Sequence, residues 1–125
     1  HEAFPELAPY AARLSDAWEA DPTLAGLKGI QARVILGDAR DTLCHQDWSA
    51  DAWFLDGFSP AKNPELWDEK LMKDVNTHTK TGGTFATYTA AGFVRRNLET
   101  AGFTVSRVPG YGRKRHMTTG IKERA

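Results

Sequence analysis

The segment that most constrains the fold is residues 52–58 (AWFLDGF), where apolar side chains fill four consecutive positions before an aspartate and a glycine. A strand with water on one face alternates apolar and polar residues, whereas an inner strand of a parallel sheet is buried on both faces and is continuously apolar. The segment therefore predicts a central strand of a parallel α/β sheet, with Asp56 at its carboxyl end.

Helical and strand patterns alternate along the rest of the chain. Before this run, the sequence favours an amphipathic helix near 9–20, a β-rich strand over 32–38 (ARVILGD), and a short helix and turn over 38–51. After it, a helix is expected over 65–79, because apolar residues recur there at every fourth position. These residues are Trp67, Leu71 and Val75.

The last part of the chain predicts one more strand, one more helix and a hairpin. A glycine pair turns the chain into a strand over 84–89, and a helix follows over 90–101 with Gly102 at the position of a C-terminal cap. Two strands, 103–108 and 114–121, are joined by a glycine-rich turn. The order predicts an α/β fold with crossover connections, closed by an antiparallel hairpin.

Charge is unevenly distributed along a chain that is neutral overall. Residues 1–90 hold 8 basic against 14 acidic residues, a net charge of −6, and residues 91–125 hold 8 against 2, a net charge of +6. A localised basic surface favours an anionic partner such as nucleic acid. Solvated surface charges explain the same distribution, so charge alone leaves both interpretations open.

The residues present disfavour several classes of protein. The single cysteine, Cys44, has no partner for an internal disulfide, and the 4 histidines lie in separate segments without metal-ligand spacing, so no structural metal is expected. No apolar run is long enough to cross a bilayer and no signal segment opens the chain, which predicts a cytoplasmic protein without a membrane partner. Walker, G-x-S-x-G and HExxH motifs are absent.

Asp56 has two interpretations of equal weight on pattern alone. A carboxylate after a strongly apolar strand is costly to place unless it is used, which favours a hydrogen-bond acceptor or general base that faces a ligand pocket. Asp-Gly is also a common turn pair, so Asp56 could instead cap the turn at Gly57. Phe58, just beyond the strand, is a candidate ligand contact because aromatic rings stack on bases.

Asp38 stands at the end of the other apolar run in an equivalent position. A carboxylate there can accept hydrogen bonds from ribose hydroxyls or from an exocyclic amine. It can also cap the amino end of a helical segment over 39–43, and the pattern alone favours this cap.

A cluster of cations lies in the predicted hairpin. Residues 113–115 (RKR) follow closely after Tyr111, so positive charge stands beside an aromatic ring, as phosphate contacts and base stacking require. Arg95 and Arg96, on the polar face of their predicted helix, would extend this basic surface. Basic hairpins are also often only solvated, and the pattern does not separate the two interpretations.

Five segments carry a family resemblance: 5–9 (PELAP), 51–64 (DAWFLDGFSPAKNP), 82–96 (GGTFATYTAAGFVRR), 101–103 (AGF) and 110–115 (GYGRKR). Together they resemble the methyltransferase part of the tRNA 5-methylaminomethyl-2-thiouridine biosynthesis bifunctional protein family. The resemblance covers nearly the whole chain and is weakest over 16–32. It is specific because long and unusual strings agree in the same order.

The resemblance implies a class I, Rossmann-like methyltransferase fold: a seven-stranded sheet with helices on both faces and an antiparallel last strand. Residues 1–125 would be the C-terminal half of that domain, with the later strands and helices only. The implied cofactor is S-adenosylmethionine (SAM). The implied reaction is N-methylation of the aminomethyl group on a tRNA wobble uridine, from 5-aminomethyl-2-thiouridine to 5-methylaminomethyl-2-thiouridine.

Site residues also follow from the resemblance. Asp56 matches the acidic residue that is taken as the catalytic base of the family. Asp38, followed by Ala39, matches the position expected near the adenine of the cofactor. Asp56, Gly57 and Phe58 complete the expected cofactor-binding residues.

Contacts with tRNA are expected from Arg113, Lys114, Arg115 and Lys62. The family's Gly-rich cofactor loop is absent from this sequence, as is the FAD-dependent oxidoreductase domain that some members carry. Because the sequence begins at His1 rather than at a methionine, the chain is expected to be a piece of a longer protein. Without the Gly-rich cofactor loop, this piece is expected to be inactive by itself. The alternative function is a non-catalytic tRNA-binding fragment.

Overall fold

The computed structural model describes residues 4–22, 24, 29–112 and 116–125 of the 125-residue chain. The chain divides into two compact units, His1–Gly37 and Asp38–Ala125. Within the described ranges, no helix is long and apolar enough to span a membrane.

The first unit contains a single long helix among its described residues. A 3₁₀ turn, Pro5–Leu7, leads into α1, Ala8–Ala20, which confirms the helix predicted over 9–20. Proline near the first turn suits a helix start, because it presets φ and lacks an N–H that would need a partner. The helix ends at Asp21, whose backbone N–H donates to the Ala17 carbonyl at 2.9 Å.

The strand predicted over 32–38 is not formed. Residues 31–36 are neither helix nor strand, and no strand of the described sheet pairs with them. A strand exists only when its N–H and C=O groups pair with a neighbour, whatever the propensity of its residues. Ile35 and Leu36 are accordingly 40% and 69% exposed, and the prediction that Asp38 ends a strand is wrong.

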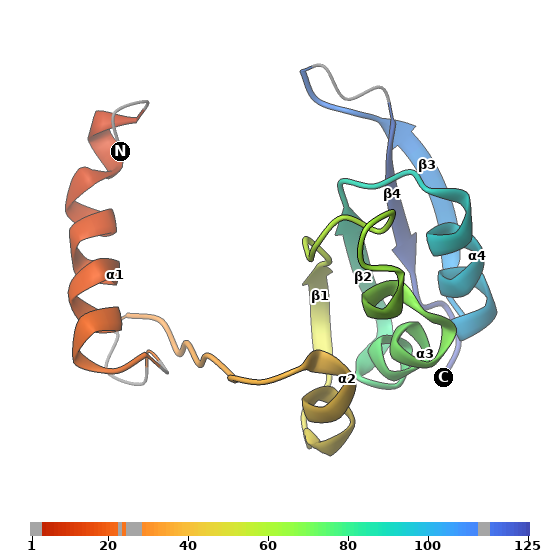
Figure 1. The fold of residues 1–125 in the computed structure, drawn as a ribbon, viewed down its shortest axis with the longest axis horizontal. Coiled ribbons are helices and arrows are strands. Elements are labelled where there is room, and N and C mark those ends of the chain that lie inside the picture. Colours follow the sequence, from red (N-terminus) through yellow and green to blue (C-terminus); the bar gives the residue numbers. More distant parts are fainter. Residues whose placement is uncertain (1–3, 23, 25–28, 113–115) are drawn as a thin grey trace. The chain divides into compact units, whose positions relative to one another are not determined.

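The second unit is built on a mixed four-stranded sheet, which confirms the α/β fold class. Its strands are β1 (Ala50–Phe54), β2 (Thr79–Thr87), β3 (Thr104–Pro109) and β4 (His116–Ile121), in the order β1-β2-β4-β3. The first two are parallel, and β4 lies between β2 and β3 and is antiparallel to both (Figure 1). The predicted closing hairpin is therefore confirmed, with its second strand inserted into the sheet.

β1 is shorter and less central than predicted. It ends at Phe54, and within the described sheet it pairs with β2 alone, so it is an edge strand. Trp53 packs against the core while Phe54, on the opposite face, is 82% exposed. A strand is buried on both faces only where helices cover both, and α3 (Glu69–Thr77) and α4 (Gly92–Ala101) of the second unit lie on one face (Figure 1). Asp56 consequently lies two residues past the end of β1.

β2 begins earlier than predicted. It starts at Thr79 and continues through the glycine pair that was expected to form a turn. Pairing with β1 shifts from Ala50 opposite Thr79 to Ala52 opposite Thr84, so the extra residues form an irregularity in the strand. The strand persists because it also pairs with the end of β4, where the Gly82 N–H donates to the Lys122 carbonyl at 2.7 Å.

Helices α3 (Glu69–Thr77) and α4 (Gly92–Ala101) pack on the same face of the sheet (Figure 1). The helix predicted over 65–79 is divided, because Asp68 caps the amino end of α3 after a 3₁₀ turn, Pro64–Trp67. The helix predicted over 90–101 is confirmed, and it ends at Gly102. The φ of +118° at Gly102 is accessible to glycine at little cost, which explains this residue as the cap.

The core lies between these two helices and the sheet. Its buried apolar residues are Leu43, Trp67, Leu71, Met72, Val75, Phe85, Val94, Leu98 and Phe103. The predicted helical face is thereby confirmed, since Trp67, Leu71 and Val75 are all buried. Leu43 comes from a 3₁₀ turn, Leu43–His45, that follows the short helix α2, Ala39–Thr42, as expected for the segment over 38–51.

Candidate active site

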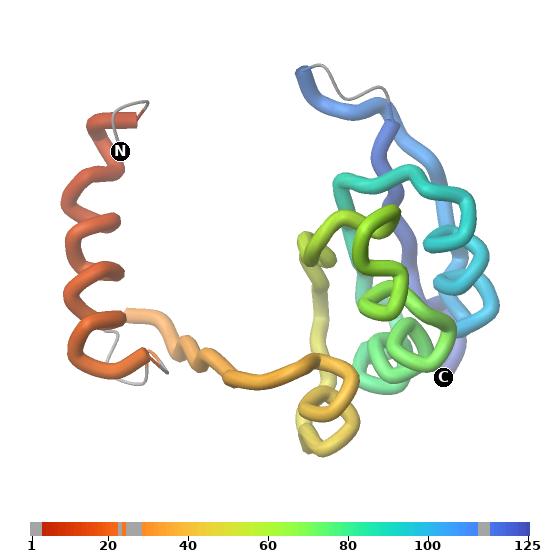
Figure 2. The backbone as a smooth tube through the Cα atoms, viewed as in Figure 1, coloured from red at the N-terminus to blue at the C-terminus, as the bar shows by residue number. Residues whose placement is uncertain are grey.

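Two loops lie side by side at the carboxyl ends of β1 and β2. Residues 55–63 lead from β1 toward α3, and residues 88–91 lead from β2 into α4 (Figure 2). Parallel pairing extends one residue past β1, because the Leu55 N–H donates to the Ala86 carbonyl at 2.9 Å. Open α/β sheets bind their ligands at this edge. Asp56 lies here, so the sheet places it where a reacting group would meet a ligand.

Hydroxyl groups from the end of β2 hold the backbone on both sides of Asp56. The Thr87 hydroxyl donates to the Leu55 carbonyl at 2.6 Å. The Tyr88 hydroxyl donates to the Gly57 carbonyl at 2.9 Å. The residues immediately before and after Asp56 are thus each bonded to a side chain that is about thirty positions later in the sequence, which ties the loop to the sheet.

An indole ring holds the next residue of the loop. Trp67 Nε1 donates to the Phe58 carbonyl at 2.7 Å, and the Trp67 carbonyl in turn accepts from Asn97 Nδ2 at 2.9 Å. The Trp67 and Tyr88 rings meet edge to face, with centroids 6.4 Å apart and an interplanar angle of 88°. Trp67 is 2% exposed, so this side of the loop rests on the core.

The Asp56 carboxylate itself is left available. Its side chain is exposed, and in the part of the chain that the structure describes no hydrogen bond or ion pair engages it. A turn-capping aspartate would accept from a nearby backbone N–H. The absence of such a bond among the described residues disfavours the turn-cap interpretation. Phe58 beside it is 69% exposed, although its backbone is held.

Asp38 caps α2, as the sequence pattern alone favoured. Its Oδ1 accepts from the Arg40 backbone N–H at 2.9 Å, and its Oδ2 accepts from Arg40 Nη2 at 2.7 Å. The side-chain hydrogen bonds from Arg40 lower the pKa of the Asp38 carboxyl below its ordinary value. Ala39 is the first residue of α2 and is exposed. The hydrogen bonds and the ion pair described for the Asp38 side chain all involve Arg40, and the cofactor role of Asp38 stays a prediction.

Of the predicted tRNA contacts, Lys62 is described and is exposed on the loop after Asp56. Its backbone N–H donates to the Ser59 carbonyl at 3.2 Å, so the loop forms a tight turn there. The other predicted contacts, Arg113, Lys114 and Arg115, lie outside the described residues.

Sequence reasoning missed the groups that hold the loop. It assigned Trp67 to the helix core, which is correct for the ring but overlooks the indole N–H, and it gave Thr87 and Tyr88 no role. One signal was available: a buried Trp or Tyr usually finds a hydrogen-bond partner for its polar atom. Which carbonyl serves as that partner has no sequence pattern, because every residue carries one.

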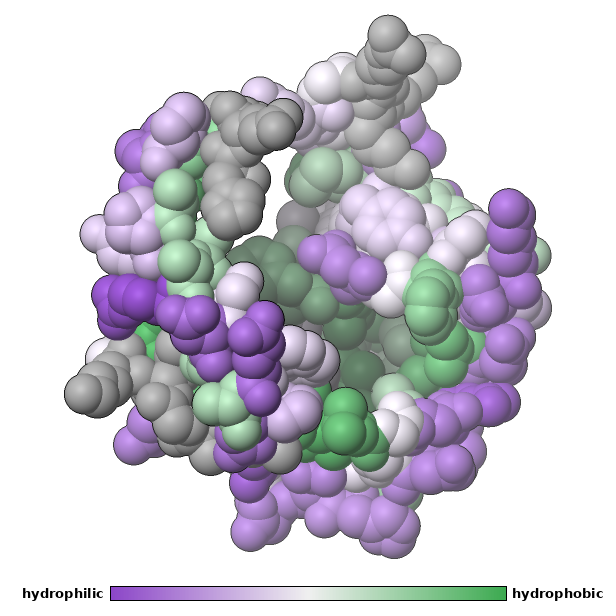
Figure 3. All heavy atoms as spheres, turned by 60° about the vertical axis from the view of Figure 1, so that its left-hand side comes forward, coloured by the Kyte–Doolittle hydropathy of each residue, from purple (hydrophilic) through white to green (hydrophobic). Residues whose placement is uncertain are grey.

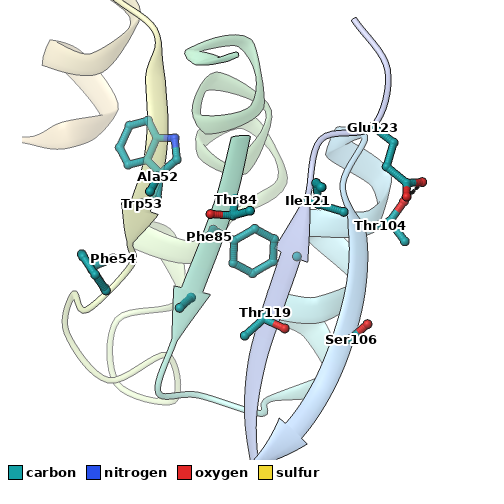
Figure 4. A pocket seen from close by; sticks show the side chains of 12 residues that line it. Ala52, Trp53, Phe54, Thr84, Phe85, Thr104, Ser106, Thr119, Ile121 and Glu123 are labelled. Carbon is teal, nitrogen blue, oxygen red and sulfur yellow. Dashed lines mark hydrogen bonds between the residues drawn. The ribbon is translucent and has the colours of Figure 1, made fainter. Parts of the chain in front are cut away.

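A broad hollow of about 600 Å³ lies over the sheet and is separate from this site. Its lining comes from all four strands, including Phe54, Thr84, Thr119 and Ile121 (Figure 4). In the view of Figure 3, hydrophobic residues, coloured green, are visible at the surface of the molecule. Asp56 does not line the hollow. The hollow therefore marks the sheet face that α3 and α4 leave uncovered, and it is not the reacting centre.

A mixed sheet of this order, with a parallel strand pair followed by an antiparallel hairpin, is typical of the later part of a Rossmann-like α/β fold. No group of three or more His, Cys, Asp or Glu side chains suited to a metal ion is found among the described residues. The chain belongs to a family of S-adenosyl-L-methionine-dependent methyltransferases, whose model matches residues 5–123. The family predicted from the sequence is thereby confirmed.

The similar proteins are more specific than the family. The chain is 44% identical over 128 residues to the tRNA 5-methylaminomethyl-2-thiouridine biosynthesis bifunctional protein MnmC of Hahella chejuensis (strain KCTC 2396), covering 97% of this chain and 20% of that protein. It thus spans about a fifth of the length of that relative. The crystal structure of MnmC2 from Aquifex aeolicus matches with a TM-score of 0.67 and 35% identity, over 76% of this chain and 32% of that chain.

Proposed function

We propose that the intact protein transfers a methyl group from SAM to the amino nitrogen of 5-aminomethyl-2-thiouridine at the wobble position of tRNA, giving 5-methylaminomethyl-2-thiouridine. Membership of the family supports the methyl donor, and the name of the Hahella relative supports the nucleoside. The observation that carries the assignment of Asp56 as catalytic base is its exposed carboxylate, without a described partner, on a loop that is held on both sides.

The reaction explains why a carboxylate is needed. A primary aliphatic amine is mostly protonated near neutral pH and then has no lone pair with which to attack. The Asp56 carboxylate accepts a hydrogen bond from the ammonium group, takes its proton, and aims the nitrogen. SAM, when bound, supplies a methyl group on a positively charged sulfur, which the nitrogen takes up as the carbon–sulfur bond breaks. An ordinary carboxylate is a weak base, so orientation contributes more than basicity.

The cofactor contacts from this chain are proposed to be Asp38, Ala39, Asp56, Gly57 and Phe58. Carboxylate oxygens accept hydrogen bonds from the hydroxyl and amine groups of an adenosine. The Asp38 side chain remains 34% exposed beside Arg40, so it keeps a surface on which a ligand hydroxyl or amine can bind. Among the described residues, a Cβ atom on Gly57 would meet only the Trp67 ring, at 3.8 Å, which leaves the outer side of the loop open.

Binding of tRNA is proposed to involve Lys62, Arg113, Lys114 and Arg115, with Arg95 and Arg96 of α4 as an extension. Residues 91–125 carry a net charge of +6, which supports this part of the chain as the one that contacts the phosphates of tRNA. A cytoplasmic location, and an FAD-dependent oxidoreductase domain in the intact protein, complete the proposal. The name of the Hahella relative, which calls it bifunctional, supports the second of these.

Replacing Arg113, Lys114 and Arg115 together by alanine is expected to weaken tRNA binding at low salt and to make the affinity less dependent on salt, by about one unit of slope for each phosphate that is no longer neutralised. The measurement is tRNA affinity as a function of salt concentration. Triple replacement of Lys70, Lys73 and Lys80, which are exposed, removes the same charge and serves as the control. Equal losses of affinity in the two variants would contradict a localised tRNA-binding surface.

The uneven charge also favours a second candidate, a non-catalytic tRNA-binding fragment. Calorimetric titration with SAM separates the two functions. We expect the intact protein to bind SAM, and the 125-residue chain to bind it weakly or not at all, because its sequence lacks a Gly-rich loop after a first strand. An intact protein that binds tRNA but not SAM would favour the second candidate.

Methyl transfer tests the leading proposal. Labelled methyl groups from SAM should enter tRNA that carries the unmethylated aminomethyl group. Fully modified tRNA should take up none, because its nitrogen already carries the methyl group. Equal labelling of both tRNAs would contradict the proposed acceptor.

A further inference from the structure

The loop that carries Asp56 is held through its backbone while its side chains stay exposed. Among the described residues, each of the three carbonyls at positions 55, 57 and 58 accepts a hydrogen bond from a side chain outside the loop, at 2.6, 2.9 and 2.7 Å. The side chains of Asp56 and Phe58 are exposed. These hydrogen bonds hold the backbone on both sides of Asp56, and they leave the carboxylate oxygens of Asp56 unoccupied.

Tyr88 makes the bond that bears most directly on Asp56. Gly57 has no side chain, so its direction can be set only through its backbone, and the Tyr88 hydroxyl donates to its carbonyl at 2.9 Å. The rotation of the peptide plane between Gly57 and Phe58 is thereby restricted. Because Asp56 directly precedes Gly57, freeing this plane changes the direction in which the Asp56 carboxylate points.

The ring of Tyr88 and its hydroxyl act separately. The ring packs edge to face on Trp67, with centroids 6.4 Å apart, and this packing does not depend on the hydroxyl. Trp67 is itself anchored, since its carbonyl accepts from Asn97 of α4 at 2.9 Å. Removing only the hydroxyl should therefore keep the ring in place while the Gly57 carbonyl loses its partner.

We infer that Tyr88 is a positioning residue for methyl transfer: its hydroxyl holds the Gly57 carbonyl, and through it the Asp56 carboxylate, in the direction that the amine requires. The inference rests on the proposed function. Catalytic groups depend steeply on position, and a misplacement of about 1 Å can lower a rate by about 100-fold. Groups that lock the backbone under a catalytic side chain accordingly matter to the rate although they never touch the substrate.

Tyr88→Phe in the intact protein is the direct test. It should lower kcat for methyl transfer by on the order of 10- to 100-fold. KM for SAM and for tRNA should change little, because the variant removes no group that is proposed to bind either. A structural role alone would lower the unfolding temperature and leave kcat of the folded enzyme as it is.

Thr79→Val is the matched control. Thr79 is buried at the amino end of β2, and its hydroxyl donates to the Val75 carbonyl at 2.6 Å and accepts from Trp53 Nε1 at 2.9 Å. Valine keeps the shape and loses both bonds, at the edge of the sheet away from Asp56. This variant should lower the unfolding temperature more than Tyr88→Phe does, with kcat unchanged. An equal loss of kcat in both variants would overturn the inference.

A double-mutant cycle shows whether Tyr88 acts through Asp56. In an Asp56→Asn background, Tyr88→Phe should cost little further activity, because the group that it positions is already gone. A full and independent loss in that background would mean that Tyr88 acts elsewhere, and would overturn the inference.

Hydrogen exchange supplies a readout that does not need activity. Amide exchange of residues 57–63 should speed up in Tyr88→Phe and not in Thr79→Val. Unchanged exchange together with unchanged kcat would overturn the positioning role while wild-type methyl transfer still supports the proposed function. A wild-type protein without methyl transfer would overturn the proposed function instead, and the exchange rates alone would then show whether Tyr88 holds the loop.

Discussion

Replacing Asp56 by asparagine is expected to lower the rate of methyl transfer by about 10²- to 10⁴-fold, the usual contribution of a positioned acid or base. Asparagine has the same shape, but its neutral amide neither takes a proton from the ammonium group nor stabilises its charge. The rate should be measured in single turnover with the intact protein and unmethylated tRNA. SAM affinity, measured separately by calorimetry, should fall much less than the rate.

Asp51→Asn is the matched control for this variant. Asp51 is an exposed aspartate in β1, 3.4 Å from Lys80 Nζ, and it lies near the end of the strand away from Asp56. Its amide variant also removes one negative charge, within β1 rather than on the loop that follows it, and should leave the rate close to wild type. Normal turnover with wild-type SAM affinity in Asp56→Asn would contradict the role of Asp56.

Replacing Gly120 by alanine is expected to cause the largest loss of stability. Gly120 of β4 is paired with Phe85 of β2, and a Cβ atom on it would overlap the Phe85 ring, where even Cζ would be only 2.6 Å away. Phe85 cannot easily move, because it is 2% exposed and packs edge to face on Phe103 at 4.9 Å. Overpacking of this kind costs about 1–3 kcal/mol or more.

Thermal unfolding of the chain measures the effect, at roughly 4–8 °C per kcal/mol for a domain of 60–100 residues. Thr119→Ala is the control, since Thr119 is the neighbour on β4 and lines the uncovered face of the sheet. Phe85→Leu should cost less in the Gly120→Ala background than alone, because it relieves the overlap. An alanine variant as stable as wild type would contradict the close approach, since alanine is otherwise the better residue within a strand.

The parts of the fold that follow from local periodicity could be predicted from the sequence. Trp67, Leu71 and Val75 recur at helical spacing because one face of the helix meets the core, and all three are buried. Gly102 marks a helix end because its left-handed backbone favours glycine. Local rules of this kind act within a few residues, so one sequence displays them.

The parts that depend on distant partners could not be predicted. The apolar run over 32–38 has strand propensity but no pairing strand among the described residues. Thr79 begins β2 although its neighbours Lys80 and Thr81 are polar, because the far end of β4 pairs with this region. The buried Lys122 also donates from Nζ to the Thr79 carbonyl at 2.9 Å. Such interactions join residues that are tens of positions apart and leave no periodic pattern.

The candidate site shows the same division. The position of Asp56 after an apolar strand is visible in the sequence, and the family resemblance favours a catalytic role over a turn cap. The three hydrogen bonds that hold the loop at Asp56 were not visible, because their acceptors are backbone carbonyls. Sequence therefore identified the candidate reacting group, and the structure identified the groups that hold its loop.

Analysis of the nucleosides from tRNA treated with the intact protein and SAM tests the central claim most directly. Digestion and mass spectrometry should show loss of 5-aminomethyl-2-thiouridine and an equal gain of 5-methylaminomethyl-2-thiouridine at the wobble position, with almost none formed by Asp56→Asn in the same time. Methylation at any other nucleoside, or equal formation of the product by wild type and Asp56→Asn, would contradict methyl transfer to this amine with Asp56 as its base.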